Sequence, residues 1–255
     1  MLSNAIIIIA CITGALLFLY AVVRVSPPHQ RKESNDFTGA VVAVIGTTYA
    51  VILAFTLSGV WYMFQGAQAN EEQEANALTN VFRIATQLQD LTARPIQELC
   101  VRYADNAIHR EWPALAEGNM PPEGGMMINQ LWQLAGQAQA HAQPDAIAAY
   151  QLMEELRGLT QYRRQRVLQG RERLPAILWA VLIAGGIVTV VASCFFGVTN
   201  FRFHLLQVLL LSFLISLALV AIADIDRPYQ GIVRVDPEGF ANALQTLQQQ
   251  YGATK

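Results

Sequence analysis

Residues 37–70 read FTGAVVAVIGTTYAVILAFTLSGVWYMFQGAQAN, a stretch of 34 residues without one charged side chain. As a helix, about 20 apolar residues rising about 1.5 Å each cross the ~30 Å hydrocarbon core of a bilayer. The stretch is longer than this, and between Gln65 and Glu74 only Gly66 weakens a helix. We therefore expect a membrane span from about Thr38 through Phe64 that continues as a helix into water.

Three further windows contain no Asp, Glu, Lys or Arg, and they have lengths of 22, 28 and 21 residues: Leu2–Val23, Leu174–Phe201 and Phe203–Ala223. Soluble core helices rarely reach such lengths without a charge. The chain is only 14% charged, against about 25% for soluble proteins. The sequence predicts an all-α polytopic membrane protein with four transmembrane helices, near Ala5–Val23, Thr38–Phe64, Leu174–Phe196 and Phe203–Ala223.

The domain organisation follows from these windows. We expect transmembrane helices 1 and 2 in residues 1–70, a helical soluble insert in 71–172, transmembrane helices 3 and 4 in 173–224, and a turn with an amphipathic helix in 225–255. Apolar residues recur at helical spacing in the insert. After the extension of span 2, they predict a helix from Pro95 that stops at Trp112-Pro113, a loop over 117–125, a helix over 126–140, and one from Pro144-Asp145 that runs into span 3.

The orientation rests on basic residues beside the spans. Five arginines against one acid precede span 3, and by the positive-inside rule they place the insert and both termini in the cytoplasm. Three basic residues of the first loop argue the opposite orientation, and we give the denser group more weight. The residues are Arg163, Arg164, Arg166, Arg171 and Arg173 in the first group, and Arg24, Arg31 and Lys32 in the second.

Two faces of span 2 carry distinct patterns. Small residues recur every four positions on one face, which permits close helix packing when lipid supplies no hydrophobic drive. The other face combines two threonines with an apolar collar, as a pore-lining helix that gates by dewetting requires. Ordinary packing, with each threonine bonded one turn back, is the alternative. The packing face is Gly46, Ala50, Ala54 and Ser58, and the candidate pore face is Thr48, Ile52, Phe55, Thr56 and Gly59.

The charge distribution limits the function classes. The spans hold no Asp, Glu, Lys or Arg, whereas pumps and coupled carriers usually do. Four helices are too few for an aqueous channel within one protomer, so a pore requires a ring of copies. Glu71, Glu72 and Glu74 follow span 2, where they either form an acidic ring that favours cations or a solvated helix face.

No pattern indicates catalysis, a cofactor or a metal site. The three cysteines and four histidines lack ligand spacing, and surface positions are the simplest interpretation of the histidines. Asp224 and Asp226 alone supply too few oxygens for calcium, and a salt bridge to Arg227 or Arg234 is the simpler interpretation. The net charge of −2 gives no polycationic surface for nucleic acid. We therefore expect no enzyme.

Several segments together resemble one family, the bacterial bestrophin-like domain proteins. They occur in the family's order over most of the chain. The most specific follows span 4 and contains Asp226, Arg227, Pro228, Tyr229 and Gly231, which we interpret as a structural turn with Tyr229 at the membrane–water interface. The full set is residues 49–55 (YAVILAF), 74–78 (EANAL), 111–113 (EWP) and 226–231 (DRPYQG).

The resemblance implies a distant relation to bestrophins, which are pentameric anion channels with cytoplasmic helical domains and a pore lined by the second span. Ile52 and Phe55 are then the neck candidates. The acidic calcium-clasp run of true bestrophins is absent after the last span, which argues against calcium gating. We expect a homo-oligomeric, chloride-conducting channel in the bacterial inner membrane, with lipid and inorganic ions as its other partners. The relation to bestrophins implies a pentamer. The alternative is a non-conducting scaffold or sensor whose insert binds a protein.

Overall fold

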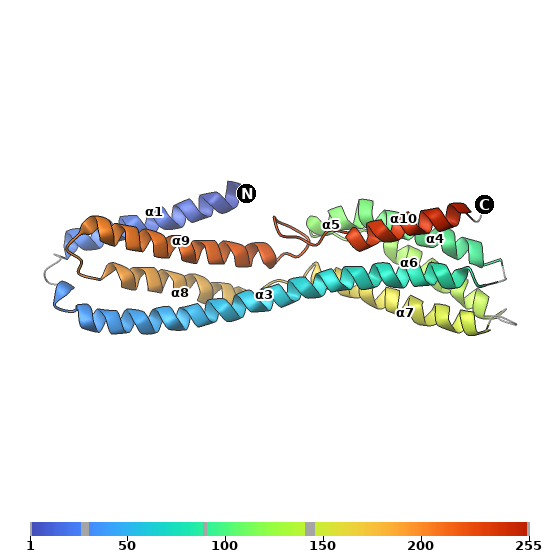
Figure 1. Ribbon diagram of the computed structural model, residues 1–255, viewed down its shortest axis with the longest axis horizontal. Helices are drawn as coiled ribbons and strands as arrows, with labels where there is room; N and C mark the ends of the chain where they lie inside the picture. Colours follow the sequence, from blue (N-terminus) through green and yellow to red (C-terminus); the bar gives the residue numbers. More distant parts are fainter. Residues whose placement is uncertain (1, 27–30, 89–90, 141–145, 254–255) are drawn as a thin grey trace. The chain divides into compact units, whose positions relative to one another are not determined.

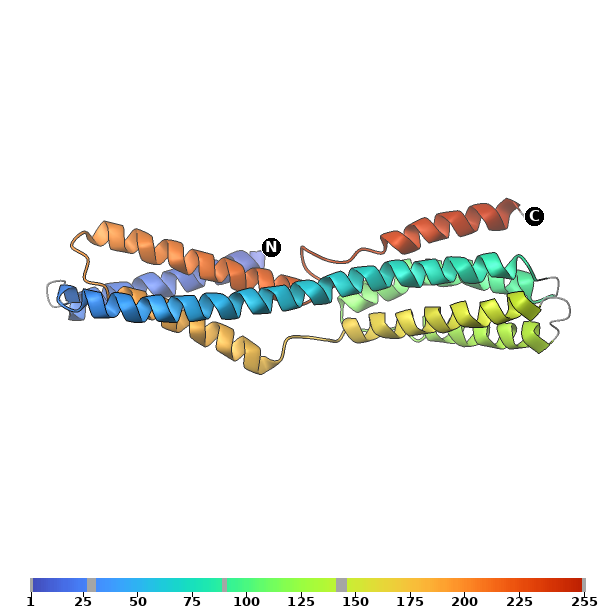
Figure 2. The same cartoon turned by 60° about the horizontal axis from the view of Figure 1, so that its bottom comes forward.

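The computed structural model describes residues 2–26, 31–88, 91–140 and 146–253. Within these ranges the regular elements are all helical, which confirms the all-α expectation (Figures 1 and 2). The chain divides into two compact units, Met1–Tyr62 with Arg173–Asp226 and Met63–Glu172 with Arg227–Lys255. We call them unit 1 and unit 2.

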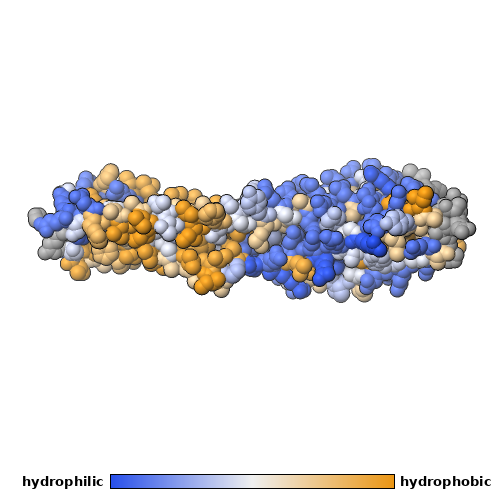
Figure 3. All heavy atoms as spheres, turned by 90° about the horizontal axis from the view of Figure 1, so that it is seen from below, coloured by the Kyte–Doolittle hydropathy of each residue, from blue (hydrophilic) through white to orange (hydrophobic). Residues whose placement is uncertain are grey.

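Unit 1 contains α1 (Leu2–Val25), the first part of α3 (Asn35–Ala85), α8 (Ala176–Cys194) and α9 (Phe201–Ile225). These four helices are long and apolar enough to cross a membrane. Few of their side chains are buried inside the protomer, and large apolar ones remain exposed on every helix, which colours the surface of this unit orange in Figure 3. Such a surface requires lipid or further protein, because water does not solvate it favourably.

The second span extends far beyond the bilayer length. Helix α3 has 51 residues, and at about 1.5 Å per residue it measures about 75 Å. The expected continuation of the helix past Phe64 is confirmed. The residues before Tyr62 belong to unit 1 and those after it to unit 2.

Arg31 and Asn35, the first residue of α3, form hydrogen bonds with the turn between α8 and α9. The Asn35 side chain accepts a hydrogen bond from Gly197 N at 2.8 Å and donates one to Gly197 O at 3.1 Å. Arg31, counted above as an orienting charge, is buried and donates to Cys194 O at the end of α8 and to Phe196 O in the turn that follows. A Cβ at Gly197 would lie 2.3 Å from Lys32 N, so this approach requires glycine. Pro27, Pro28 and His29 lie outside the described residues.

Unit 2 is a helical bundle with a polar surface (Figure 3). It consists of the second part of α3, α4 (Ala93–Asn106), η1 (Ala107–Glu111), α5 (Trp112–Ala116), α6 (Glu123–Ala140), α7 (Ala146–Gln169) and α10 (Glu238–Ala253). Helix α4 packs on α6 and α10, and α6 packs on α7. The core consists of side chains at helical spacing, including Leu78, Phe82, Tyr103, Leu156 and Phe240.

The predicted stop at Trp112-Pro113 is wrong. Helix α4 continues through one π-helical turn, η1, in which Trp112 N bonds to Ala107 O, and then into α5. Pro113 stands in the first turn of α5, where the wider preceding turn accommodates a residue without an N–H. The helix predicted over 126–140 begins three residues earlier, at Glu123.

The predicted continuity of the fourth insert helix with span 3 is also wrong. Helix α7 ends at Gln169, and α8 begins only after Pro175. Pro175 has no N–H to donate to a continuing helix. The backbone N–H of Leu174, just before it, donates to the Asp226 carboxylate at 2.8 Å. The predicted start at Pro144-Asp145 lies outside the described residues.

Candidate pore face and buried ion network

The inner face of α3 in unit 1 is fixed by a tyrosine against two glycines. Tyr49 is buried, and its hydroxyl donates to Leu182 O of α8 at 2.9 Å. A Cβ at Gly185 would lie 2.5 Å from the Tyr49 ring, and one at Gly186 would lie 3.0 Å from its hydroxyl oxygen. About three turns further along α3, Val60 joins Leu182 and Ile222 in a small apolar cluster. These contacts fix the rotation of α3.

The predicted pore face divides between the two sides of α3. Thr48, Phe55 and Gly59 are exposed, and Phe55 is 75% accessible. Ile52 is half-buried and packs on the Val60 cluster. Thr56 is also half-buried, and its hydroxyl bonds to Ile52 O one turn back at 2.9 Å, which is the packing alternative for this threonine.

The small-residue ladder is on the outer side. Ala50, Ala54 and Ser58 are exposed, and Gly46 is half-buried with no atom within 4 Å of an added Cβ. Among the residues that the structure describes, no other segment thus packs directly against α3 at Gly46.

Unit 2 encloses an ion network that the sequence analysis did not find. Arg166 of α7 donates to both carboxylate oxygens of Glu74, at 2.7 and 2.9 Å, and to Glu111 Oε2 at 2.6 Å. All three side chains are fully buried. Arg163 donates to the other Glu111 oxygen at 2.7 Å. Two carboxylates and two guanidinium groups thus balance in charge, as ions removed from water require.

Aromatic rings and a tyrosine hydroxyl complete this network. Tyr103 donates to Glu74 Oε1 at 2.6 Å, and Arg166 lies over the Trp112 ring at 4.9 Å. Burial raises the pKa of Tyr103 well above its ordinary value, and the Glu74 charge raises it further. Desolvation lowers the pKa of Arg166, but Glu74 and Glu111 outweigh it and raise that pKa well above its ordinary value.

One glycine makes room for the network. A Cβ at Gly124, in the first turn of α6, would lie 2.0 Å from Glu111 Oε1. The signal available in the sequence was the Glu111-Trp112-Pro113 segment, together with acids and arginines inside otherwise apolar helical patterns. Spacing alone did not reveal that these side chains from α3, η1 and α7 meet.

Two of the three acidic residues after span 2 are buried, contrary to both arrangements expected from the sequence. Glu71 is 2% exposed and Glu74 is 0% exposed. These two residues therefore belong neither to an acidic ring nor to a solvated helix face. Both are bonded inside unit 2, Glu74 as above and Glu71 to the backbone N–H of Phe240. Of the three acidic residues, only Glu72 is exposed.

His204 also departs from the expected surface position, because it is 2% exposed.

The segment after span 4 is a turn that buries Asp226, Pro228 and Tyr229 and leaves Arg227 and Gly231 exposed. Asp226 caps the C-terminal end of α9, and its carboxylate accepts a hydrogen bond from Leu174 N–H. Arg234, which the sequence analysis suggested as a salt-bridge partner, pairs with Asp236 instead. Tyr229 is 3% exposed and meets the Trp112 ring edge-on at 5.6 Å, so its expected interfacial position is wrong. The remaining motif residues shape the turn: Gln230 N bonds to Arg227 O, Val235 N bonds to Pro228 O, and Gly231 has a φ of 86°.

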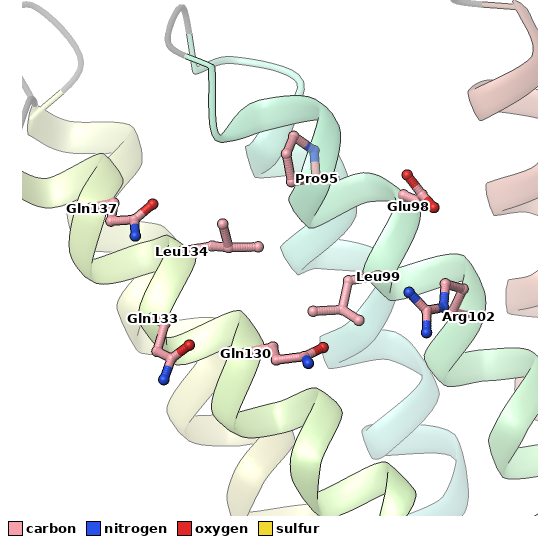
Figure 4. Close-up of a pocket in the computed structure, with 8 residues that line it drawn as sticks. All are labelled: Pro95, Glu98, Leu99, Arg102, Gln130, Gln133, Leu134 and Gln137. Carbon is pink, nitrogen blue, oxygen red and sulfur yellow. The ribbon is translucent and has the colours of Figure 1, made fainter.

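Grooves on unit 2 are shallow or polar. Figure 4 shows one of about 310 Å³ between α4 and α6, where Leu99 and Leu134 point toward each other. A larger one, of about 560 Å³, separates α3 from α10. Within residues 2–26, 31–88, 91–140 and 146–253, no three His, Cys, Asp or Glu side chains are grouped to hold a metal ion.

The model of the Bestrophin-like domain family matches residues 9–240. The chain belongs to the Bestrophin-like family. The suspected resemblance is thereby confirmed, and the match includes α1 from Ile9 onward, the other three apolar helices and unit 2 as far as Phe240. A multi-pass membrane protein follows from this match and the apolar helices. Among curated proteins, none matches this Bestrophin-like chain.

Solved structures share the fold of this Bestrophin-like protein. A bacterial bestrophin homologue from Klebsiella pneumoniae, in a single-substitution form, has a TM-score of 0.75 at 13% identity, covering 96% of this chain and 99% of that one. A zinc-phased structure of the homologue has a TM-score of 0.72 at 12% identity, with coverages of 96% and 98%. A structure described as a membrane protein variant has a TM-score of 0.76 at 12% identity, with the same coverages of 96% and 98%.

Proposed function

We propose that the chain is the subunit of a homo-oligomeric ion channel of the bestrophin type, with its pore lined by the exposed side of α3. Membership of the family and the shared fold support this class. The alternative is a non-conducting scaffold or sensor. It would have the same membrane helices, so only a measurement of ion conduction distinguishes the two functions.

The composition of the exposed faces supports α3 as the pore helix. Helices α8 and α9 bury hydroxyl side chains, such as Thr189 and Ser212, and expose large apolar ones to their surroundings. Helix α3 also exposes large apolar residues, but unlike α8 and α9 it exposes hydroxyl side chains among them, those of Thr47, Thr48 and Ser58. Hydroxyl groups are unfavourable toward lipid but suit a water-filled passage.

Phe55 carries the proposed constriction. It is 75% exposed within the protomer, and it follows Thr48 by seven residues, or two helical turns. In a ring of copies with α3 at the axis, Phe55 forms an apolar collar between the hydroxyl groups of Thr48 and the wider level of Gly59. Ile52, half-buried beside Phe55, supports the collar from behind.

We propose chloride-like anions as the conducted ions and a ring of five copies, as the relation to bestrophins implies. The burial of Glu71 and Glu74 supports anions, because two of the three carboxylates that would attract cations are bonded within unit 2. An apolar constriction at Phe55 does not discriminate between anions and cations. The charged groups along the pore therefore decide which ions pass.

The test is purified full-length protein in planar bilayers under asymmetric potassium chloride. We expect a current whose reversal potential lies near that of chloride. Phe55→Ala removes the collar and raises the conductance more than about twofold, whereas Leu210→Ala, which truncates a residue exposed on α9, does not. Absence of current from assembled protein refutes the channel and favours the scaffold. A current that Phe55→Ala leaves unchanged refutes the collar.

A further inference from the structure

A buried carboxyl group of α3 holds the first turn of α10. Glu71 Oε1 accepts a hydrogen bond from Phe240 N at 2.9 Å, across 169 residues of sequence. A Cβ at Gly239 would lie 2.8 Å from Glu71 Oε2, so the carboxyl group approaches only because this residue is glycine. Phe240 itself is fully buried, and α10 is thereby anchored at its N-terminal end.

The surroundings of Glu71 disfavour its charged form. Burial raises the pKa of Glu71 to about 7, the like charges of Glu72 and Glu74 raise it as well, and the Phe240 N–H acts in the opposite direction. Arg166, the fully buried cation of the ion network, is bonded to Glu74 and Glu111. Within the described part of the chain, Glu71 forms no ion pair that would fix its charge.

Other charged or titratable groups surround Glu71 on each packed element. Tyr103 and Tyr229 do not change charge near neutral pH, because burial raises the pKa of both. Arginine stays charged throughout this range. The groups are Glu72, Glu74 and Arg83 on α3, Tyr103 on α4, Glu111 on η1, Arg166 on α7, Tyr229, Arg234 and Asp236 before α10, and Glu238 on α10.

A groove gives protons a route to this carboxyl group. The groove of about 560 Å³ between α3 and α10 is lined by Glu71, Gly239 and the outer turns of both helices. Because Glu71 lines this groove, we expect its carboxyl group to exchange protons with solvent without unfolding of unit 2.

We propose that Glu71 and the first turn of α10 form a proton-sensitive latch, in which protonation tightens the docking of α10 on α3 and ionisation loosens it. With α10 docked, Glu71 titrates near pH 7; with α10 detached, it meets water and returns to its ordinary value of 4.5. The docked state therefore binds more protons between these values. Its stabilisation is complete below about pH 4.5 and is lost as the pH rises through about 7.

Hydrogen–deuterium exchange of the full-length protein in detergent tests the latch at pH 6 and pH 8. After correction for the intrinsic pH dependence of exchange, protection of the α10 amides falls about tenfold between the two values. Protection of α6, which does not contact Glu71, supplies the reference within the same molecule. The measurement uses a background with His109→Gln and His141→Gln, because histidine ordinarily titrates near pH 6.5.

Two variants make the test specific. Glu71→Gln keeps the shape and an acceptor oxygen but cannot ionise, so α10 protection becomes independent of pH. Glu72→Gln, the exposed neighbour, retains most of the tenfold fall. The latch is refuted if α10 in the unsubstituted background responds no more than α6, a result that needs no variant to fold. It is also refuted if Glu71→Gln retains the full fall.

Discussion

Arg166 Nε lies 2.7 Å from Glu74 Oε2, and neither side chain is exposed. The contact joins α7 to the extension of the second membrane helix, and Glu111 and Tyr103 complete it. A charge buried so deeply is stable only while its partners remain, because desolvation of an unpaired ion costs several kcal/mol. Removal of any one partner is therefore expected to destabilise unit 2.

Arg166→Met leaves Glu74 and Glu111 without their shared cation. We expect it to destabilise unit 2 by about 3–5 kcal/mol, measured as a loss of thermal stability by circular dichroism in detergent. The control is Arg157→Ala, whose pair with Glu154 is 67% and 46% exposed and contributes about 0–1 kcal/mol. Equal effects of the two substitutions would contradict the assignment.

Two glycines of α6 provide a matched pair. A Cβ at Gly124 would lie 2.0 Å from Glu111 Oε1, whereas one at Gly136 meets nothing within 4 Å. Gly124→Ala therefore displaces Glu111 and lowers stability by about 1–3 kcal/mol. Gly136→Ala raises stability by about 0.5–1 kcal/mol, because alanine favours the helix. Thermal unfolding of both variants measures the difference, and the same sign for both would exclude the steric explanation.

The exposed ladder of α3 predicts a specific assembly defect. Ala54→Leu adds volume on a face that the protomer leaves open, so the folded protomer tolerates it while close packing against another copy does not. We expect helical content to remain and the oligomer to dissociate, as measured by light scattering after size exclusion. Val188→Leu, on the exposed face of α8, is the control and keeps the native mass. An unchanged mass for Ala54→Leu would remove the ladder from the interface.

The orientation remains a prediction, and the structure changes its basis. Arg163 and Arg166, two of the five arginines that suggested a cytoplasmic insert, are bonded to Glu111 and Glu74 within unit 2. We expect a cysteine at the exposed Glu117, in a Cys11→Ser background, to resist an impermeant thiol reagent in intact cells and to react after lysis. Labelling before lysis would invert the topology.

Regular patterns over consecutive residues were predictable from the sequence. The apolar windows, the unbroken course of α3 and the family segments all depend on neighbours along the chain. Predictions failed where a distant residue decided the outcome. Pro113 follows a π turn instead of ending a helix. Tyr229 packs against Trp112 inside unit 2 instead of lying at the membrane–water interface.

The amino-acid sequence by itself determined that the chain is helical and that four segments are apolar enough for a membrane, because length and composition fix the free energy of transfer into lipid. Only the tertiary structure decided which polar side chains are functional candidates. Glu71, Glu74, Glu111 and Arg166 have ordinary positions in the sequence, and their burial and pairing arise when separate helices bring them within hydrogen-bonding distance. Long-range pairing of this kind leaves no period in the sequence, since each partner belongs to a different helix.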